Sequence, residues 1–180
     1  MSFAFSRRSF LKYTAVAAVA VAGASLFTGC KIDTSDSYNA LRTTPGELTV
    51  LQVTAAMGTY VEASKSYTAP DVTGTTIAFP FKITNGRANP IYVNPNNFKA
   101  TVLDAEGKVI ANAKYTAING LTPDASLCDT NLKKGASVSG NVTLTLSAAL
   151  EPGQSVVLTY CPDLQYNEYS LNWKTTRAKD

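Results

Sequence analysis

Hydrophobic and polar residues alternate with a period of two over most of the chain beyond residue 47. In the clearest run, Ile77, Phe79, Phe81 and Ile83 form one apolar face. The segments that show this alternation are 48–53, 76–83, 98–103, 138–146, 156–160 and 169–173. Their content of Thr, Val and Tyr favours strands over helices, and no window after residue 29 keeps a helical period. Roughly seven short strands over about 130 residues predict an all-β fold, a two-sheet antiparallel β-sandwich over residues 47–175, with a C-terminal tail at 176–180.

The inward faces of these strands predict a core. The residues expected in it are Phe79, Phe81, Leu144, Leu158 and Trp173. Pro80 lies within the clearest strand but has no N–H to donate to a neighbour. We therefore expect that strand to be a sheet edge at Pro80 or to carry a bulge there.

The first 29 residues are typical of an export signal. The run Ser6-Arg7-Arg8-Ser9-Phe10-Leu11-Lys12 matches the twin-arginine export motif, in which Arg7, Arg8, Phe10, Leu11 and Lys12 are the characteristic positions. The apolar stretch 15–28 that follows is shorter than the ~20 residues needed to span a bilayer. The alternative is an ordinary secretory signal with a chance arginine pair.

A lipid anchor is predicted at the end of this leader. Leu26-Phe27-Thr28-Gly29-Cys30 resembles a lipobox, although Phe27 stands where a leucine is usual. Cleavage before a lipidated Cys30 would leave two or three acyl chains, enough for stable anchoring at the outer face of a bacterial cell membrane. The alternative is a plain signal, cut after a small residue, that releases a soluble protein. Residues 30–46 are polar and predict a flexible tether, with an N-terminal strand for part of it as the alternative.

The amino-acid composition excludes several classes of binding and catalytic site. The 180 residues include 16 Lys and Arg, 13 Asp and Glu, and no His. Three of the basic residues, Arg7, Arg8 and Lys12, belong to the leader, so the rest of the chain is formally neutral and lacks the basic excess expected for nucleic-acid binding. The absence of histidine removes Ser-His-Asp and Cys-His relays and histidine-bearing zinc or copper sites. The acidic residues are scattered singly, which does not favour a glycosidase-like carboxylate pair.

Several short pieces resemble one family. These are Phe81-Lys82-Ile83-Thr84-Asn85, Pro90-Ile91-Tyr92-Val93-Asn94-Pro95, Leu103-Asp104-Ala105-Glu106-Gly107-Lys108, Leu132-Lys133-Lys134-Gly135, Leu158-Thr159-Tyr160 and Trp173-Lys174. From residue 47 to residue 174 the chain resembles the Ig-like domain-of-unknown-function family common in bacterial lipoproteins. The resemblance implies an Ig-like sandwich and an extracytoplasmic location, and it carries over no catalytic residue.

Three groups of residues remain as candidate sites. Cys128 and Cys161 are an even pair in an exported protein and predict a disulfide, with two free buried thiols as the alternative. Oxygen ligands for calcium could come from Asp163, Asn167 and Glu168 or from Asn94, Asn96 and Asn97, although both sets are more often turn formers. Trp173 with Tyr166 and Tyr169 could line a binding patch, although core positions are favoured for Tyr169 and Trp173.

The sequence predicts a non-enzymatic, membrane-tethered Ig-like binding module without a cofactor or metal. Its partner would be an unknown extracytoplasmic protein. The alternative is a carrier or sensor of a small ligand held within the sandwich. An apolar pocket between the sheets would favour that alternative, whereas a closed core with an exposed surface patch would favour the binding module.

Overall fold

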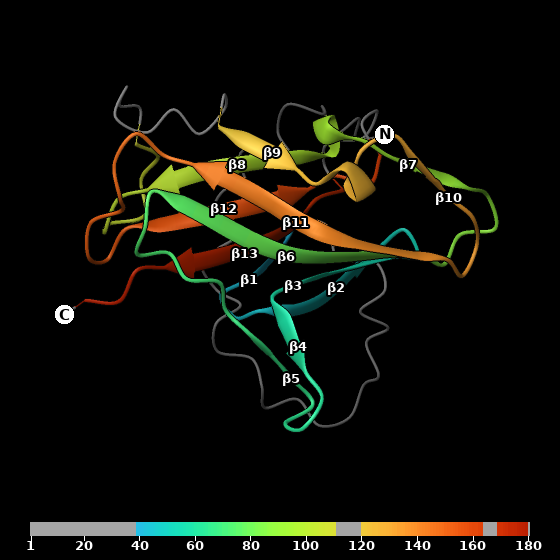
Figure 1. Cartoon of the computed structure of the whole chain (residues 1–180), viewed down its shortest axis with the longest axis horizontal. Helices are drawn as coiled ribbons and strands as arrows, with labels where there is room; N and C mark the ends of the chain where they lie inside the picture. Colours follow the sequence, from blue (N-terminus) through green and yellow to red (C-terminus); the bar gives the residue numbers. More distant parts are fainter. Residues whose placement is uncertain (1–38, 111–119, 164–168, 180) are drawn as a thin grey trace, which may run out of the picture. The chain divides into compact units, whose positions relative to one another are not determined.

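A computed structural model of the chain describes residues 39–110, 120–163 and 169–179. Two sheets form the body of this part (Figure 1). The four-stranded sheet has the order β1 (Ala40–Arg42), β13 (Leu171–Thr176), β12 (Ser155–Tyr160) and β8 (Phe98–Leu103). The five-stranded sheet has the order β2 (Gly46–Val50), β3 (Val53–Met57), β6 (Thr76–Asn85), β11 (Ser137–Thr145) and β9 (Leu121–Pro123).

Two small ribbons complete the architecture. One pairs β7 (Ile91–Val93) with β10 (Thr130–Leu132), and the other pairs β4 (Thr59–Val61) with β5 (Ser66–Thr68). Single 3-10 turns lie at Pro95–Asn97 (η3) and Ala125–Leu127 (η4). The described ranges contain no helix long and apolar enough to cross a membrane. The predicted all-β sandwich is confirmed.

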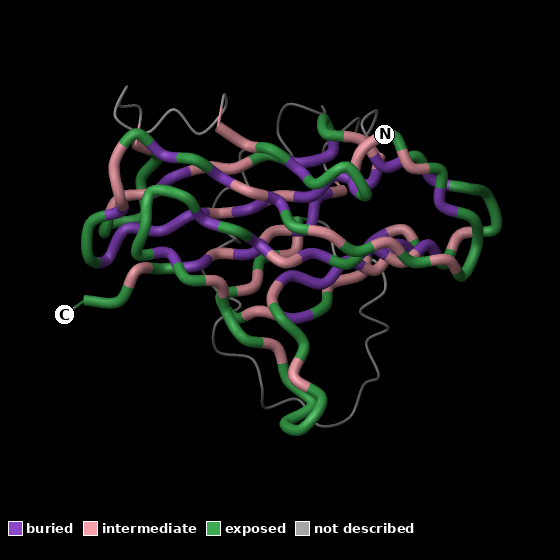
Figure 2. Tube along the Cα trace, viewed as in Figure 1, coloured by how far each residue is buried: buried purple, intermediate pink, exposed green. Residues whose placement is uncertain are grey.

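The core lies between the two sheets, as the alternation predicts (Figure 2). All five core residues expected from the sequence are buried, with exposures of 3% or less. Phe81 of the five-stranded sheet meets three aromatic rings of the four-stranded sheet edge to face: Phe98 at 5.5 Å, Tyr160 at 5.8 Å and Trp173 at 5.2 Å between ring centroids. The indole Nε1 of Trp173 donates to the carbonyl of Gly46 at 2.9 Å, so the buried N–H has a partner. This cluster joins the sheets.

Pro80 lies at a sheet edge, as predicted. Strand β3 pairs with β6 only from Phe81 to Asn85, so the side of Pro80 that faces β3 lies beyond the end of that strand. The Gly58 N–H reaches across and donates to the Pro80 carbonyl at 2.8 Å. The missing proline N–H therefore costs the sheet no ladder bond there.

The segment predicted as one strand at 48–53 is a hairpin, and that prediction is wrong. Leu51 and Gln52 both have positive φ, 49° and 60°, which makes a two-residue turn of the I′ type between β2 and β3. The turn lacks the usual Asn-Gly signal because distant groups hold it. Gly86 N donates to the Gln52 carbonyl and Arg87 Nε donates to the Leu51 carbonyl, both at 2.8 Å. A Cβ on Gly86 would lie 2.6 Å from the Gln52 oxygen, so only glycine allows this approach.

The sandwich begins earlier than residue 47. Ala40–Arg42, which we expected in the tether, form β1, so the alternative of an N-terminal strand holds for these residues. Strand β1 pairs with β13 in parallel, with Ala40 opposite Leu171 and Arg42 opposite Trp173. The four-stranded sheet is therefore mixed, which corrects the expectation of a purely antiparallel sandwich. The other end of the fold is also slightly longer than predicted, because β13 includes Thr176.

Candidate functional site

One end of the sandwich gathers the residues that enclose a surface pocket. In the four-stranded sheet, Ala40, Leu171, Tyr160 and Phe98 lie in one row across the strands. The loops that follow β6 and β12 meet just beyond this row. Asn39 is the first described residue, and its Oδ1 accepts from Ser170 Oγ at 2.7 Å, so the chain enters the sandwich at this same end. We call this end of the fold the entry end.

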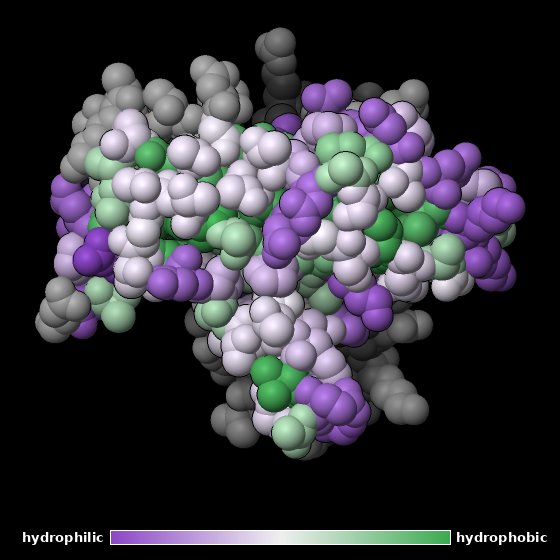
Figure 3. Space-filling view, in the orientation of Figure 1, coloured by the Kyte–Doolittle hydropathy of each residue, from purple (hydrophilic) through white to green (hydrophobic). Residues whose placement is uncertain are grey.

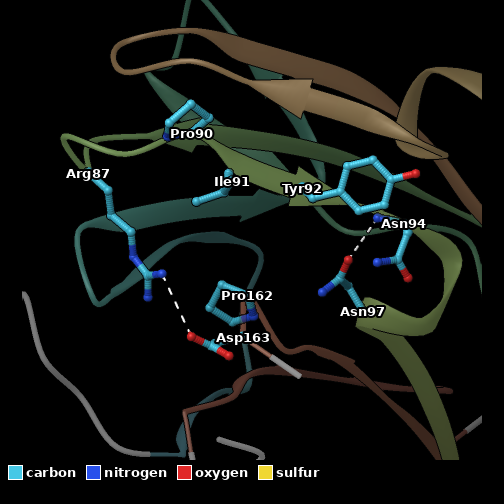
Figure 4. Close-up of a pocket in the computed structure, with 8 residues that line it drawn as sticks. All are labelled: Arg87, Pro90, Ile91, Tyr92, Asn94, Asn97, Pro162 and Asp163. Atoms are coloured by element: carbon cyan, nitrogen blue, oxygen red, sulfur yellow. Dashed lines mark hydrogen bonds and ion pairs between the residues drawn. The ribbon is translucent and has the colours of Figure 1, made fainter. Parts of the chain in front are cut away.

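A pocket of about 340 Å³ opens at the entry end (Figure 4). One wall is the segment from Arg87 to Tyr92, and the other comes from η3 and the loop after β12. The lining residues are Arg87, Pro90, Ile91, Tyr92, Asn94, Asn97, Pro162 and Asp163. Figure 4 shows Arg87 directed across the opening toward Asp163. Their Nη1 and Oδ2 atoms are 3.9 Å apart, and both side chains are about a quarter exposed, which screens this ion pair.

Asparagine side chains hold both walls in place. Asn97 is buried; its Oδ1 accepts from Asn94 N at 2.7 Å, and its Nδ2 donates to the Cys161 carbonyl at 2.7 Å. Asn85 at the end of β6 is also buried, and its Nδ2 donates to the carbonyls of Asn89 and Leu132 at 3.0 and 2.9 Å. These amides satisfy loop backbone that would otherwise be buried without partners, so the pocket is preformed.

Two of the three asparagines that we considered as calcium ligands, Asn94 and Asn97, are cap residues. The Asn94 side chain accepts from Asn96 N at 2.8 Å, and Asn97 completes a capping box around η3. Asp163, from the other candidate set, faces Arg87, whereas Asn167 and Glu168 lie outside the described residues. Within the part of the chain that is described, no three His, Cys, Asp or Glu side chains lie together as a metal site would require.

Burial raises the pKa values of two groups behind the pocket, the phenol of Tyr160 and the thiol of Cys161. Burial raises the pKa of the Tyr160 phenol, an effect that the nearby Arg87 charge partly opposes. Burial also raises the pKa of the Cys161 thiol, and the positive charge of Lys99 partly lowers it again. Both groups are held neutral near pH 7, so they contribute packing and not charge to the pocket.

The structure does not show the predicted disulfide. Cys128 and Cys161 are both free thiols in the structure. Cys161 follows β12 of the four-stranded sheet and is buried, whereas Cys128 follows η4 and its Sγ donates to the Pro123 carbonyl at 3.6 Å. Cys161 is buried, as the alternative of two buried thiols requires, whereas Cys128 is only half-buried, and the bridge stays a prediction.

Of the remaining residues singled out from the sequence, some are described by the structure and others are not. Trp173 is fully buried and Tyr169 packs against the core, so these two are core residues and not a surface patch. Tyr166 lies outside the described residues, as do Arg7, Arg8, Phe10, Leu11, Lys12 and Cys30. The structure therefore bears on neither the export motif nor the anchor, and both stay predictions.

The β4–β5 ribbon is a second exposed feature, and the sequence did not indicate it. It projects from the sandwich beside β2 and β3 (Figure 1), and we call it the arm. Tyr60 of β4 is 47% exposed and lies 5.1 Å from the half-buried ring of Tyr67 on β5. Tyr67 Oη donates to Glu47 Oε1 at 2.7 Å, and burial together with this carboxylate raises the pKa of Tyr67 to about 12. Apolar and polar surface lie side by side on the arm (Figure 3).

Sequence reasoning missed Arg87, Tyr92, Tyr60 and Tyr67 as surface residues. The turn signal Asn85-Gly86 locates the loop that carries Arg87, but no local pattern shows that it faces Asp163. The arm strands have three residues each, too few for an alternation to be detected.

No protein-family model matches the chain, and no curated protein matches it. Solved structures with a similar fold include the Bacillus subtilis protein ycdA, provisionally assigned as a lipoprotein, at 13% identity and a TM-score of 0.45. That match covers 74% of this chain but only 39% of ycdA. The yjhA protein of B. subtilis matches at 11% identity and a TM-score of 0.42, over 73% of this chain and 95% of its own. An uncharacterized β-sandwich protein of Clostridium difficile matches at 6% identity and a TM-score of 0.42, over 77% and 95%.

Proposed function

We propose that this chain is a non-enzymatic, lipid-anchored extracytoplasmic protein whose sandwich domain binds a partner protein through its surface. The export motif around Arg7 and Arg8 and the junction Gly29-Cys30 support the location. The resemblance to the Ig-like family of bacterial lipoproteins agrees with both the β-sandwich fold and the extracytoplasmic location. The domain then acts as a module held at the outer face of the membrane.

The aromatic cluster between the sheets is the observation that supports binding through the surface. The rings of Phe81, Tyr160 and Trp173 occupy the space between the sheets, at centroid distances of 5.2 and 5.8 Å from Phe81. The pocket at the entry end lies outside this cluster, on the surface, and its lining mixes apolar with charged and amide side chains. A ligand carrier of this fold would need an apolar cavity between the sheets. Among the described residues, aromatic rings fill this part of the space between the sheets, which supports recognition by surface contact instead.

The arm is the surface best suited to a protein partner. Aromatic side chains on a projecting hairpin offer large contact area at low cost in side-chain entropy, and tyrosine is among the residues that dominate protein interfaces. Tyr60 is exposed in the middle of β4, and the hydrogen bond to Glu47 holds its neighbour Tyr67 in place. The arm thus presents the exposed ring of Tyr60, which packs against the ring of Tyr67.

Substitution on the arm tests this function. Tyr60→Ser removes the exposed ring, and Val109→Ser removes another exposed apolar side chain, 66% accessible, from a different loop. The experiment compares the proteins cross-linked to each anchored variant in intact cells, with wild type as the reference. We expect one specific cross-linked species to be lost in Tyr60→Ser and kept in Val109→Ser. A cross-linking pattern that Tyr60→Ser leaves unchanged contradicts binding through the arm.

A further inference from the structure

The entry end has a fixed maximum distance from the proposed anchor. Asn39 is hydrogen-bonded to Ser170 at this end of the sandwich, and Cys30 lies about nine residues upstream. At ~3.3–3.6 Å per residue, this length of chain reaches at most ~30 Å in any conformation. Strand β13 starts at the entry end and runs away from it, so the C-terminal end of the domain lies opposite. A lipid on Cys30 would therefore hold the entry end within ~30 Å of the bilayer surface.

Exposed lysines cluster around this same end. Lys133 and Lys134 lie in the turn between β10 and β11, where Gly135 N donates to the carbonyl of Asn85 at 2.6 Å. Lys99 is the exposed residue after Phe98 at the start of β8, close enough to Cys161 for its charge to lower the pKa of that thiol. Figure 3 shows hydrophilic residues gathered at the end of the sandwich that carries β7 and β10.

Two described acidic residues lie at this end. Asp163 faces the cation Arg87, whereas Asp129 accepts a hydrogen bond from the neutral Tyr92 Oη at 2.7 Å and keeps its negative charge. Asp129 offsets only one of the three lysines, so the described residues of the entry end carry an excess of positive charge. The domain as a whole balances its charges, so this positive charge is local.

We propose that the entry end docks on anionic phospholipid headgroups through Lys99, Lys133 and Lys134. This proposal rests on the proposed anchor at Cys30, because the anchor holds the lysines near the bilayer. Basic side chains gain free energy near an anionic bilayer surface, and three of them shift the equilibrium between docked and free orientations by roughly two orders of magnitude. The attraction acts within a Debye length of about 8–10 Å, which the short tether allows.

Docking fixes the orientation of the domain. The entry-end pocket then faces the headgroups, and the turns at the opposite end, including 104–108 and 151–154, point away from the membrane. Recognition of a protein partner is left to surfaces outside the entry end, such as the arm.

Lysine acylation in the anchored protein tests this docking. The processed chain is purified from membranes and reconstituted into vesicles of phosphatidylcholine, with or without phosphatidylglycerol. A water-soluble amine reagent is added, and mass spectrometry measures the modification rate of each lysine. We expect Lys99, Lys133 and Lys134 to react roughly tenfold more slowly on the anionic vesicles at low salt, and at the unprotected rate in high salt. Lys108 and Lys179, exposed at the opposite end, serve as internal controls and should react equally on both vesicles.

A matched pair of variants separates local from total charge. Lys133→Gln/Lys134→Gln should abolish most of the protection read at Lys99, whereas Lys108→Gln/Lys179→Gln, with the same change in net charge, should preserve it. Equal rates for all lysines on both vesicle types, with the protein still membrane-bound, overturn the docking and leave the anchor intact. A processed chain that does not associate with either vesicle overturns the anchor, and the docking with it.

Discussion

Phe81→Ala should cost this domain a large part of its stability. The ring is 3% exposed and contacts Phe98, Tyr160 and Trp173, all in the opposite sheet. Truncating a buried phenylalanine to alanine costs about 3–5 kcal/mol, because transfer free energy is lost and a cavity is left. Because the three edge-to-face contacts are lost as well, we expect a value near the upper limit. A domain of this size has roughly 5–15 kcal/mol in total, so this loss is about a third of the stability or more.

The single tryptophan provides the assay. Trp173 lies inside the same cluster, so its fluorescence reports loss of packing directly during urea or thermal unfolding. At about 2–4 °C per kcal/mol, the expected decrease in Tm is roughly 10–20 °C. Phe81→Leu keeps most of the apolar volume and should cost about 1–1.5 kcal/mol. Val109→Ala, at an exposed position, should stay within about 0.5 kcal/mol of wild type.

The reasoning is refuted if Phe81→Ala and Val109→Ala unfold at the same urea concentration. That result would mean that the two sheets are not joined by this aromatic cluster.

Other groups in the fold give three further predictions. Asn85→Ala removes an amide with two donated bonds and one accepted bond, so we expect a loss of about 2–4 kcal/mol in urea unfolding; a loss below 1 kcal/mol contradicts the role of this residue. A thiol reagent should modify the half-buried Cys128 in the native protein but the buried Cys161 only after unfolding, and two unreactive cysteines in the unfolded chain would show a bridge. The pKa of Tyr67 is raised from 10 to about 12, so its contribution to stability is complete below pH 10 and is lost as the pH rises toward 12. Tyr67→Phe should remove that alkaline loss in pH-dependent unfolding, and an unchanged profile counts against the bond to Glu47.

The long strands could be predicted from the alternation of apolar and polar residues, because one face of such a strand is more buried than the other. In β6 the burial follows the sequence residue by residue, with Ile77, Phe79, Phe81 and Ile83 all buried. The local sequence pattern did not predict the backbone conformation where contacts between residues far apart in the sequence determine it. The turn at Leu51-Gln52 depends on Gly86 and Arg87, which no window around residue 51 contains. Strand β1 likewise depends on pairing with β13, at the far end of the sequence.

The candidate surfaces were less predictable than the core for the same physical reason. Arg87 and Asp163 come together only because β6 and β12 end at the same side of the sandwich. Cys128 and Cys161 suggested a bridge by number and compartment, but their positions depend on which element each follows. Number and spacing in the sequence cannot supply that geometry.

Mass spectrometry of the mature N-terminus, on protein extracted from the membrane fraction, tests the central claim most directly. The account predicts a first residue at Cys30 that carries a thioether-linked diacylglycerol, and a Cys30→Ser chain that leaves the membrane fraction. An unmodified N-terminus at another residue, with the protein recovered in the soluble extracytoplasmic fraction, would contradict the tethered module.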